Sequence, residues 1–198
     1  SLGDLGCFSF YPSKNLGAYG EGGIVVTGNG ALAEKIRILR DWGQQKKYRH
    51  EVRGFNARMD GFQGAILRVK LRHLAEWTAS RRRHAVHYHE RLAGTGLTLP
   101  IEMPYATHVY HLYTVRTSNR DGLQAALQAE GVATGLHYPI PIHLQRAYAD
   151  LGLVRGTFPI SERASGEVLS LPLFPEMTDA QMDAVVGAVQ RATIATRI

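Results

Sequence analysis

The stretch CFSFYPSKNLGAYGEGG, residues 7–23, holds a single lysine, Lys14, between an aromatic segment and a run of glycines. Residues 6–10 alternate in polarity and stop just before Pro12, which predicts a short strand. The apolar run at 24–27 predicts a second strand, so the glycine-rich connection indicates a hairpin with an enlarged loop. Lys14 is expected in that loop.

A lysine amine is a nucleophile only when it is neutral, which requires burial or a cationic neighbour. The hydroxyls of Ser9 and Ser13 and the close backbone approach that glycines permit would suit a phosphate. The loop is not a Walker A motif, because GxxxxGK[ST] is absent. Taken alone, these features leave Lys14 open as either a surface charge or a reactive amine. Four aromatic residues could desolvate it: Phe8, Phe10, Tyr11 and Tyr19.

The bulk composition indicates a globular chain. It has 198 residues, 44% of them apolar, and a formal net charge of +6, which permits an anionic ligand without selecting one. A single cysteine cannot form an internal disulfide, so a cytoplasmic location is expected. No apolar run approaches the roughly 20 residues of a membrane span. The start lacks both an initiator Met and a signal peptide pattern, so we expect a piece of a longer chain.

The first part of the chain is expected to contain two helices. Apolar residues at helical spacing predict one over 31–43, and the polar residues 44–56 predict a long exposed loop. Asp60 is a good N-cap for a long helix that continues to Leu92, about 45–50 Å at 1.5 Å per residue. A helix of this length often joins two domains, so we expect domains at 1–80 and 81–198. The basic cluster Arg81–Arg83 on it predicts a solvated face.

The second part is expected to be a compact α+β unit. Strands are predicted at 109–116, 132–138 and 168–171, with a proline-fixed loop after the second. Ser118 is expected to cap a helix over 121–130, and residues 178–181 form a capping box that opens the last helix.

Several kinds of site are disfavoured by missing motifs. The nine histidines occur without HExxH or CxxC, so no metal site is expected. There is no GxSxG elbow for a hydrolase of that type. Basic and aromatic residues near Tyr48 lack an RNA-binding signature, so no nucleic acid partner is expected.

FSFYPSKNLGAYGEGG (8–23) resembles the lysine segment of the DegT/StrS-type sugar aminotransferases, a fold-type-I family that uses pyridoxal phosphate (PLP). Three further stretches agree in order with that family: LRDWGQQKKYRHEVRGFNARMDGFQGAILRVKLRHLAEWTASRR (39–82), HVYHLYTVR (108–116), and the pair GLHYPIPIHLQRAY (135–148) and LSLPLFPEMTDAQ (169–181). The resemblance runs essentially end to end. It implies an α/β fold class: a remnant of the large PLP-binding domain, made of the lysine hairpin and helices, followed by a small α+β domain.

The resemblance also implies roles for individual residues. Lys14 would hold PLP as a Schiff base and shuttle a proton. Ser9 would contact the phosphate of PLP, and Asn56 would reach that phosphate from a neighbouring subunit, making a homodimer obligatory. Arg58 suits the carboxylate of the amino donor, with a loop salt bridge as the alternative. Weaker candidates for the donor or nucleotide-sugar pocket are His111, Tyr138 and His143, the last two of which could equally be packing residues.

The implied reaction moves an amino group from an amino acid, expected to be glutamate, to a keto-sugar nucleotide. The stretches DWGQQKKY and RMDGFQGAILRVKLRHLAEW look most like members that act on 3-keto sugars. Members are about twice as long as this chain. The half that would carry the acid for the pyridinium nitrogen and the stacking ring is missing, so the chain alone is expected to be inactive. Two alternatives stay open: a non-catalytic dimerisation or binding fragment, and a PLP-dependent sugar dehydratase, although Lys14 favours transamination because a histidine replaces the lysine in those dehydratases.

Overall fold

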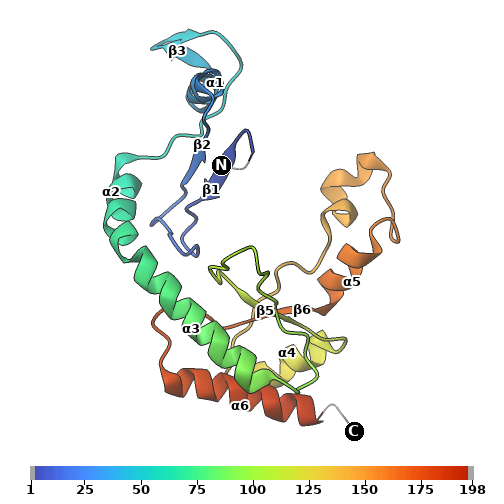
Figure 1. The fold of residues 1–198 in the computed structure, drawn as a ribbon. Helices are drawn as coiled ribbons and strands as arrows, with labels where there is room; N and C mark the ends of the chain where they lie inside the picture. The colour runs from blue at the N-terminus through green and yellow to red at the C-terminus, as the bar shows by residue number, and fades with distance from the viewer. Residues whose placement is uncertain (1–2, 196–198) are drawn as a thin grey trace. The chain divides into compact units, whose positions relative to one another are not determined.

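The fold is a computed structural model that describes residues 3–195 (Figure 1). The chain divides into two compact units, Ser1–Ala75 and Glu76–Ile198. The border between them lies in the long helix in which we expected a domain boundary near residue 80. In the part of the chain that is described, no helix is long and apolar enough to cross a membrane. Every strand within residues 3–195 pairs in a two-stranded antiparallel sheet. The elements of the first unit are β1 (Gly6–Ser9), β2 (Gly23–Val26), α1 (Gly30–Arg40), β3 (Gln44–Lys46), β4 (Arg49–His50), α2 (Gly61–Lys70) and the 3-10 turn η1 (Leu71–His73).

The predicted hairpin is confirmed. Strands β1 and β2 lie side by side and antiparallel, with Cys7 opposite Val25 and Phe8 opposite Ile24 (Figure 1). Because directly opposite residues share one face of a sheet, Phe8 and Ile24 lie on one face and Cys7 and Val25 on the other.

The helices of the first unit begin at side-chain caps. Asp60 caps α2 as predicted, since its Oδ1 accepts a hydrogen bond from the Gln63 amide at 3.0 Å. The cap of α1, Asn29, was not predicted; its Oδ1 accepts from the amides of Ala31 and Leu32. The long helix is also confirmed, with one 3-10 turn, η1, between α2 and α3 (Leu74–Leu92). The expected loop at 44–56 is partly wrong, because β3 and β4 form a short hairpin there.

The second unit is built around one two-stranded sheet. Its elements after α3 are β5 (Tyr113–Arg116), α4 (Arg120–Ala129), the 3-10 turns η2 (Ile142–Leu144) and η3 (Arg146–Leu151), α5 (Pro159–Glu167), β6 (Val168–Leu171) and α6 (Asp179–Ala195). Strand β6 has the predicted bounds and pairs with β5, with Tyr113 opposite Leu171. The capping box at the start of α6 is confirmed: the Thr178 hydroxyl accepts from the Gln181 amide, and the Gln181 side chain accepts from the Thr178 amide.

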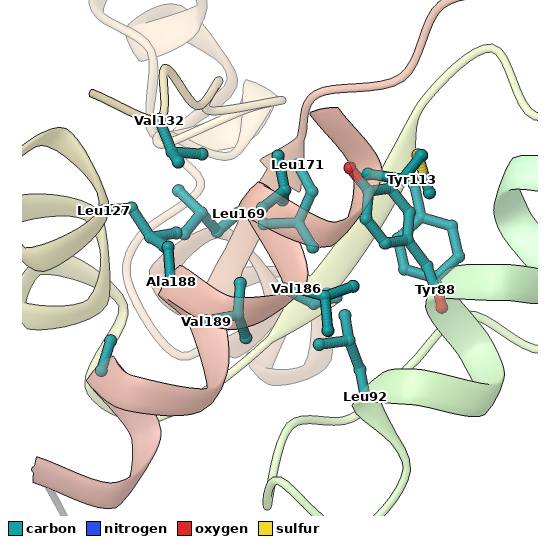
Figure 2. Packing of buried hydrophobic residues seen from close by; sticks show 14 of the residues in the cluster. Tyr88, Leu92, Tyr113, Leu127, Val132, Leu169, Leu171, Val186, Ala188 and Val189 are labelled. Carbon is teal, nitrogen blue, oxygen red and sulfur yellow. The ribbon is translucent and has the colours of Figure 1, made fainter. Parts of the chain in front are cut away.

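The core of the second unit is formed by side chains from α3, β5, α4, β6 and α6 that point toward one another (Figure 2). Leu127, Leu169 and Val186 are fully buried in it. The rings of Tyr88 and Tyr113 lie 5.0 Å apart, and the Tyr88 hydroxyl donates to the Pro172 carbonyl at 2.8 Å. Burial in this core raises the pKa of both tyrosines.

Several predictions for the second unit were wrong in detail. The strand expected at 109–116 begins only at Tyr113, because Tyr110 has a positive φ of 42° that interrupts extended backbone. The strand expected at 132–138 is reduced to one bridge between Gly135 and Ser170. The residue before α4 is Asn119 rather than Ser118, and it makes no side-chain cap. Helix α5 was not predicted.

The solvated face predicted for Arg81–Arg83 on α3 is wrong for Arg81, whereas Arg83 is exposed. Arg81 is buried, and its Nη1 donates to the carbonyls of Tyr110, His111 and Leu173 at 3.3, 3.2 and 2.9 Å. Burial lowers the pKa of this guanidinium. Arg81 therefore ties α3 to the segments before β5 and after β6 instead of facing solvent.

The described residues of the first unit form no comparable core. Every residue of the hydrophobic core cluster lies between Ala85 and Ala192. Among the described residues of the first unit, the buried apolar side chains are Ala18 and Leu67, and α1 buries none.

Candidate functional site

Lys14 lies in the loop that joins β1 to β2, as predicted, and its side chain is half-buried. The loop is closed at its base by two backbone hydrogen bonds, from the Phe10 amide to the Gly22 carbonyl at 2.8 Å and from the Ala18 amide to the Phe10 carbonyl at 2.7 Å. The Lys14 amide donates to the Tyr11 carbonyl at 2.9 Å, which makes a tight turn. The backbone that carries the lysine is therefore fixed from both sides.

The return of the loop requires a glycine. A Cβ on Gly17 would lie 2.3 Å from the Pro12 carbonyl oxygen, far inside van der Waals contact. The absence of a side chain at Gly17 lets the chain double back directly behind the proline. Gly17 and Ala18 are both buried, so the loop packs against its own backbone.

Helix α2 anchors the same loop, which sequence reasoning missed. The buried Gln63 side chain accepts from the Tyr19 amide at 2.8 Å, and the Lys70 amine donates to the Gly17 carbonyl at 2.6 Å. Gln63, Leu67 and Lys70 are spaced i, i+4 and i+7, so they share one helix face. The sequence signal for these contacts was a helix face with a polar residue at each end, Gln63 and Lys70.

Three of the four aromatic residues near Lys14 are largely exposed. Phe8 is 57% exposed, Tyr11 50% and Tyr19 73%. The ring of Tyr19 instead lies 5.3 Å from the Lys70 amine.

Ser9 ends β1 on the approach to the loop. Its side chain is exposed, and its hydroxyl accepts from the Tyr11 amide at 3.2 Å. The hydroxyl hydrogen is not used in that bond, so Ser9 can still donate to an anion.

Asn56 and Arg58 lie on a segment that runs beside the end of α1. Asn56 is exposed and forms an isolated antiparallel bridge with Asp41, and the Ala57 amide donates to the Arg40 carbonyl at 2.9 Å. Arg58 Nη1 lies 3.5 Å from Asp41 Oδ1, and its guanidinium carbon lies 5.6 Å from the Trp42 ring. Its side chain is 57% exposed, so this ion pair is screened and weak. Arg58 is therefore only loosely held by Asp41.

In the second unit, Tyr138 and His143 line the same hollow, which has a volume of about 630 Å³. Tyr138 is exposed, whereas His143 is buried, with its Nε2 3.0 Å from Glu162 Oε1 and its ring edge-on to Phe158. The Glu162 carboxylate also accepts from the amides of Gly156 and Phe158. The Gly156 amide and, after it, His143 hold the pKa of this carboxyl below its usual value.

His111 lies apart from that hollow's lining. It is half-buried, and its carbonyl accepts from Arg81. Tyr138 and His143 therefore line the same hollow, whereas His111 lies on the segment whose carbonyls accept from Arg81.

The donor groups of the first unit fit the reactive ends of PLP. They comprise a primary amine for the aldehyde at Lys14, and a hydroxyl and an amide for the phosphate at Ser9 and Asn56. Lys14, Ser9 and Asn56 include no acid for the ring nitrogen and no aromatic ring to stack on the cofactor, so the fit is partial. In the part of the chain that is described, no group of three or more metal-ligating side chains is assembled.

Comparison with known proteins gives an independent result. The profile of the DegT/DnrJ/EryC1/StrS aminotransferase family matches residues 1–190. The chain is 53% identical over 184 residues to the erythromycin biosynthesis sensory transduction protein EryC1 of Saccharopolyspora erythraea, covering 92% of this chain and 50% of the relative. It is 46% identical over 187 residues to the dTDP-3-amino-3,4,6-trideoxy-alpha-D-glucose transaminase of Streptomyces venezuelae, covering 94% of this chain and 49% of that one.

The fold agrees with solved structures of the same kind. A crystal structure of Streptomyces venezuelae DesV in complex with a ketimine intermediate matches with a TM-score of 0.92 and 44% identity, covering 96% of this chain and 52% of that one. The chain therefore spans about half the length of the curated relatives it matches.

Proposed function

Because the chain belongs to the DegT/DnrJ/EryC1/StrS aminotransferase family, we propose that it is the lysine-bearing half of an enzyme that aminates a keto-sugar nucleotide. The amino group would come from an amino acid, glutamate by preference, and PLP would be the cofactor. The fixed loop around Lys14 gives the main support, since a Schiff-base lysine must be presented on rigid backbone.

Each candidate residue has a task that its chemistry suits. Lys14 would bind the cofactor through its amine and, once released, would carry a proton between the Cα of the bound donor and the C4′ carbon of the cofactor. Ser9 donates its hydroxyl hydrogen to the cofactor phosphate, and Asn56 donates its amide to the same group. Arg58 leaves Asp41 and holds the donor carboxylate with its guanidinium fork. When bound, PLP supplies the electron sink that makes loss of the α-proton possible.

The acceptor is proposed to be a nucleotide-linked sugar with a ketone at carbon 3. Support comes from the Streptomyces venezuelae relative, whose name specifies a dTDP-3-amino sugar. Tyr138 and His143 would contact this substrate at the hollow that they line, and His111 would contact it from the segment that Arg81 fixes. His143 can do so only through the part of its ring that Glu162 and Phe158 leave accessible.

The active protein is proposed to be a homodimer. Asn56 is exposed and bonded through its backbone to Asp41, so its side chain is available to a partner subunit's cofactor. In that arrangement each site would use Lys14 of one subunit and Asn56 of the other.

The test is a hybrid protein in which this chain replaces the matching half of the 53% identical relative. PLP bound to a lysine absorbs in the visible range, so we expect this band in the hybrid and not in the 198-residue chain alone. Lys14→Ala should remove the band and the amination of 3-keto sugar nucleotides, whereas Lys35→Ala, on the exposed side of α1, should keep both. A band and activity that persist in Lys14→Ala would refute the proposal.

A non-catalytic role is the competing reading. It is favoured by the name of the 53% identical relative, which refers to sensory transduction, and by the missing core of the first unit. A hybrid that folds and forms no band with PLP would select this alternative. A hybrid that binds PLP and dehydrates a 4-keto-6-deoxy sugar without amination would instead indicate the dehydratase.

A further inference from the structure

The hollow that Tyr138 and His143 line is held together by a residue outside its lining. Besides those two residues, the lining includes Phe158. Glu162, in the first turn of α5, does not belong to the lining, and its side chain is 8% exposed. Glu162 can therefore affect a ligand in the hollow only through the residues that form its walls.

The Glu162 carboxylate bonds to both sides of the hollow. It lies 3.0 Å from Nε2 of His143 on η2, and it accepts from the Phe158 amide at 3.3 Å. It also accepts from the Gly156 amide, at 2.8 and 2.9 Å to its two oxygens. The rings of His143 and Phe158 meet edge-on, with their centroids 4.9 Å apart. One carboxylate therefore joins η2, the turn at 156–158 and α5, and fixes two rings of the wall against each other.

The turn that brings the Gly156 amide to Glu162 is itself fixed. Gly156 has a φ of 93°, in the left-handed region that favours glycine. The Thr157 hydroxyl closes the turn, because it donates to the Val154 carbonyl at 2.7 Å and accepts from the Val154 amide at 3.3 Å. The Gly156 amide is thus directed at the carboxylate without the help of a ligand.

The contact with Glu162 also determines which nitrogen of His143 carries hydrogen. The Gly156 amide lowers the pKa of the Glu162 carboxyl, so the carboxylate is ionised near neutrality and can only accept hydrogen bonds. The hydrogen between the two groups therefore stands on Nε2 of His143. Among the described residues, none bonds to Nδ1 of His143, so Nδ1 is the nitrogen left for a ligand. In the neutral ring, Nδ1 is an acceptor.

We propose that Glu162 is a positioning residue for the sugar nucleotide: it holds the His143 ring in one orientation and one tautomer, with Nδ1 as the acceptor for a substrate hydroxyl in the hollow. This inference rests on the proposed function, which assigns the substrate to the same hollow. Glu162 itself does not touch the substrate. Its effect on binding passes through His143 and the adjoining ring of Phe158.

The alternative is that Glu162 only stabilises the start of α5. Phe158, the residue before that helix, makes no side-chain cap, and an acidic residue in the first turn stabilises a helix whatever lies beside it. A carboxylate of that kind would affect stability and every measured activity alike. The contact with Nε2 of His143 favours the positioning role, because starting a helix does not require it.

The first measurement reads the tautomer and requires no activity. Nitrogen-15 NMR of the 198-residue chain distinguishes a protonated ring nitrogen from a bare one, and His143→Asn assigns the signals. At about pH 8, where an ordinary histidine is neutral, we expect hydrogen on Nε2 of His143 in the wild type. Glu162→Gln should give a mixture of tautomers, because an amide can donate to a bare Nε2 as well as accept from a protonated one. Unchanged His143 signals in that variant would overturn the proposal.

The second measurement reads binding in the hybrid protein described above. The probe is a dTDP-3-amino sugar, the kind of molecule that the name of the Streptomyces venezuelae relative specifies, and calorimetry gives its dissociation constant. Glu162→Gln and His143→Asn should each weaken binding roughly tenfold, which corresponds to about one hydrogen bond. The double variant should bind no more weakly than His143→Asn alone, because Glu162 acts through His143. Glu167→Gln is the matched control on α5; Glu167 lies 4.0 Å from Arg116 instead, so binding should stay normal.

The two halves of the reaction separate positioning from a general loss of folding. In Glu162→Gln, glutamate should remove the visible PLP band at the wild-type rate, whereas KM for the sugar nucleotide should rise roughly tenfold. Equal losses in both halves, or additive losses in the double variant, would overturn the proposal and leave Glu162 with a structural role. A hybrid that does not bind the probe would overturn it as well. A hybrid that binds the probe but forms no band would refute only the proposed function, since the tautomer and the dissociation constants are still measured.

Discussion

Replacing Leu127 with alanine is expected to destabilise the protein far more than replacing Val25 with alanine. Leu127 is fully buried where α4 packs into the core of the second unit, whereas Val25 is 41% exposed on β2. A fully buried leucine cut to alanine loses its transfer free energy and leaves a cavity, about 3 kcal/mol within a range of about 2–5 kcal/mol. Val25→Ala removes two carbons that are already partly exposed to solvent, so it should lower the free energy of unfolding by about 0.5 kcal/mol or less.

The assay is urea unfolding followed by far-ultraviolet circular dichroism. With a slope of about 1.5 kcal/mol per molar urea, the loss at Leu127 moves the midpoint down by about 2 M, and the loss at Val25 by about 0.3 M. Val186→Ala, at another fully buried site, is a milder variant if Leu127→Ala does not fold. Equal displacements for Val25 and Leu127 would refute the reasoning, because they would mean that the hairpin belongs to the same cooperative core.

Three further predictions concern single contacts. Thr178→Ala should cost about 1 kcal/mol and lower the melting temperature, because it removes the hydroxyl that caps α6. Arg81→Met should cost roughly 3 kcal/mol in urea unfolding, because it leaves three carbonyls without their donor. Glu162, whose folded pKa is lowered, contributes stability that is present above its unfolded pKa of about 4.5 and is lost as the pH falls through the folded value. Glu162→Gln should therefore be less stable at pH 7 and lose less stability on acidification.

Each of these has a control and a contrary result. Thr178→Ser keeps the hydroxyl that accepts from the Gln181 amide, and an equal loss in that variant would argue against a capping role for Thr178. Arg83 lies on the same helix, and its guanidinium donates to the Ser80 hydroxyl. If Arg83→Met lost as much stability as Arg81→Met, the contacts of Arg81 with the three carbonyls would contribute little. If Glu162→Gln kept the full acid sensitivity of the wild type, the acid response would arise at other carboxylates.

The sequence determined the features that depend on neighbouring residues. Alternation and Pro12 identified the hairpin, helical spacing and Asp60 identified the long helix, and Thr178 with Gln181 identified the last one. These succeed because strand and helix periods and caps are local. The four ordered motifs gave the family, which the comparisons then showed independently.

Two of the failures involve contacts between distant segments. The segment 132–138 looks like a strand, but only Gly135 pairs, with Ser170. Arg81 looks like part of a solvated cluster, but its partners come from Tyr110, His111 and Leu173. No local pattern encodes which chain segment arrives beside a residue, so the burial of a charge cannot be read from its neighbours.

The candidate site divides in the same way. The sequence by itself placed Lys14 in a glycine-rich loop and Ser9 on the strand before it. Only the tertiary structure decided that Gln63 and Lys70 hold that loop, that Glu162 engages His143, and that β2 lies open on both faces. The sequence determines that a lysine stands at position 14. How rigidly it is held and how far it is solvated depend on which distant groups pack against its loop.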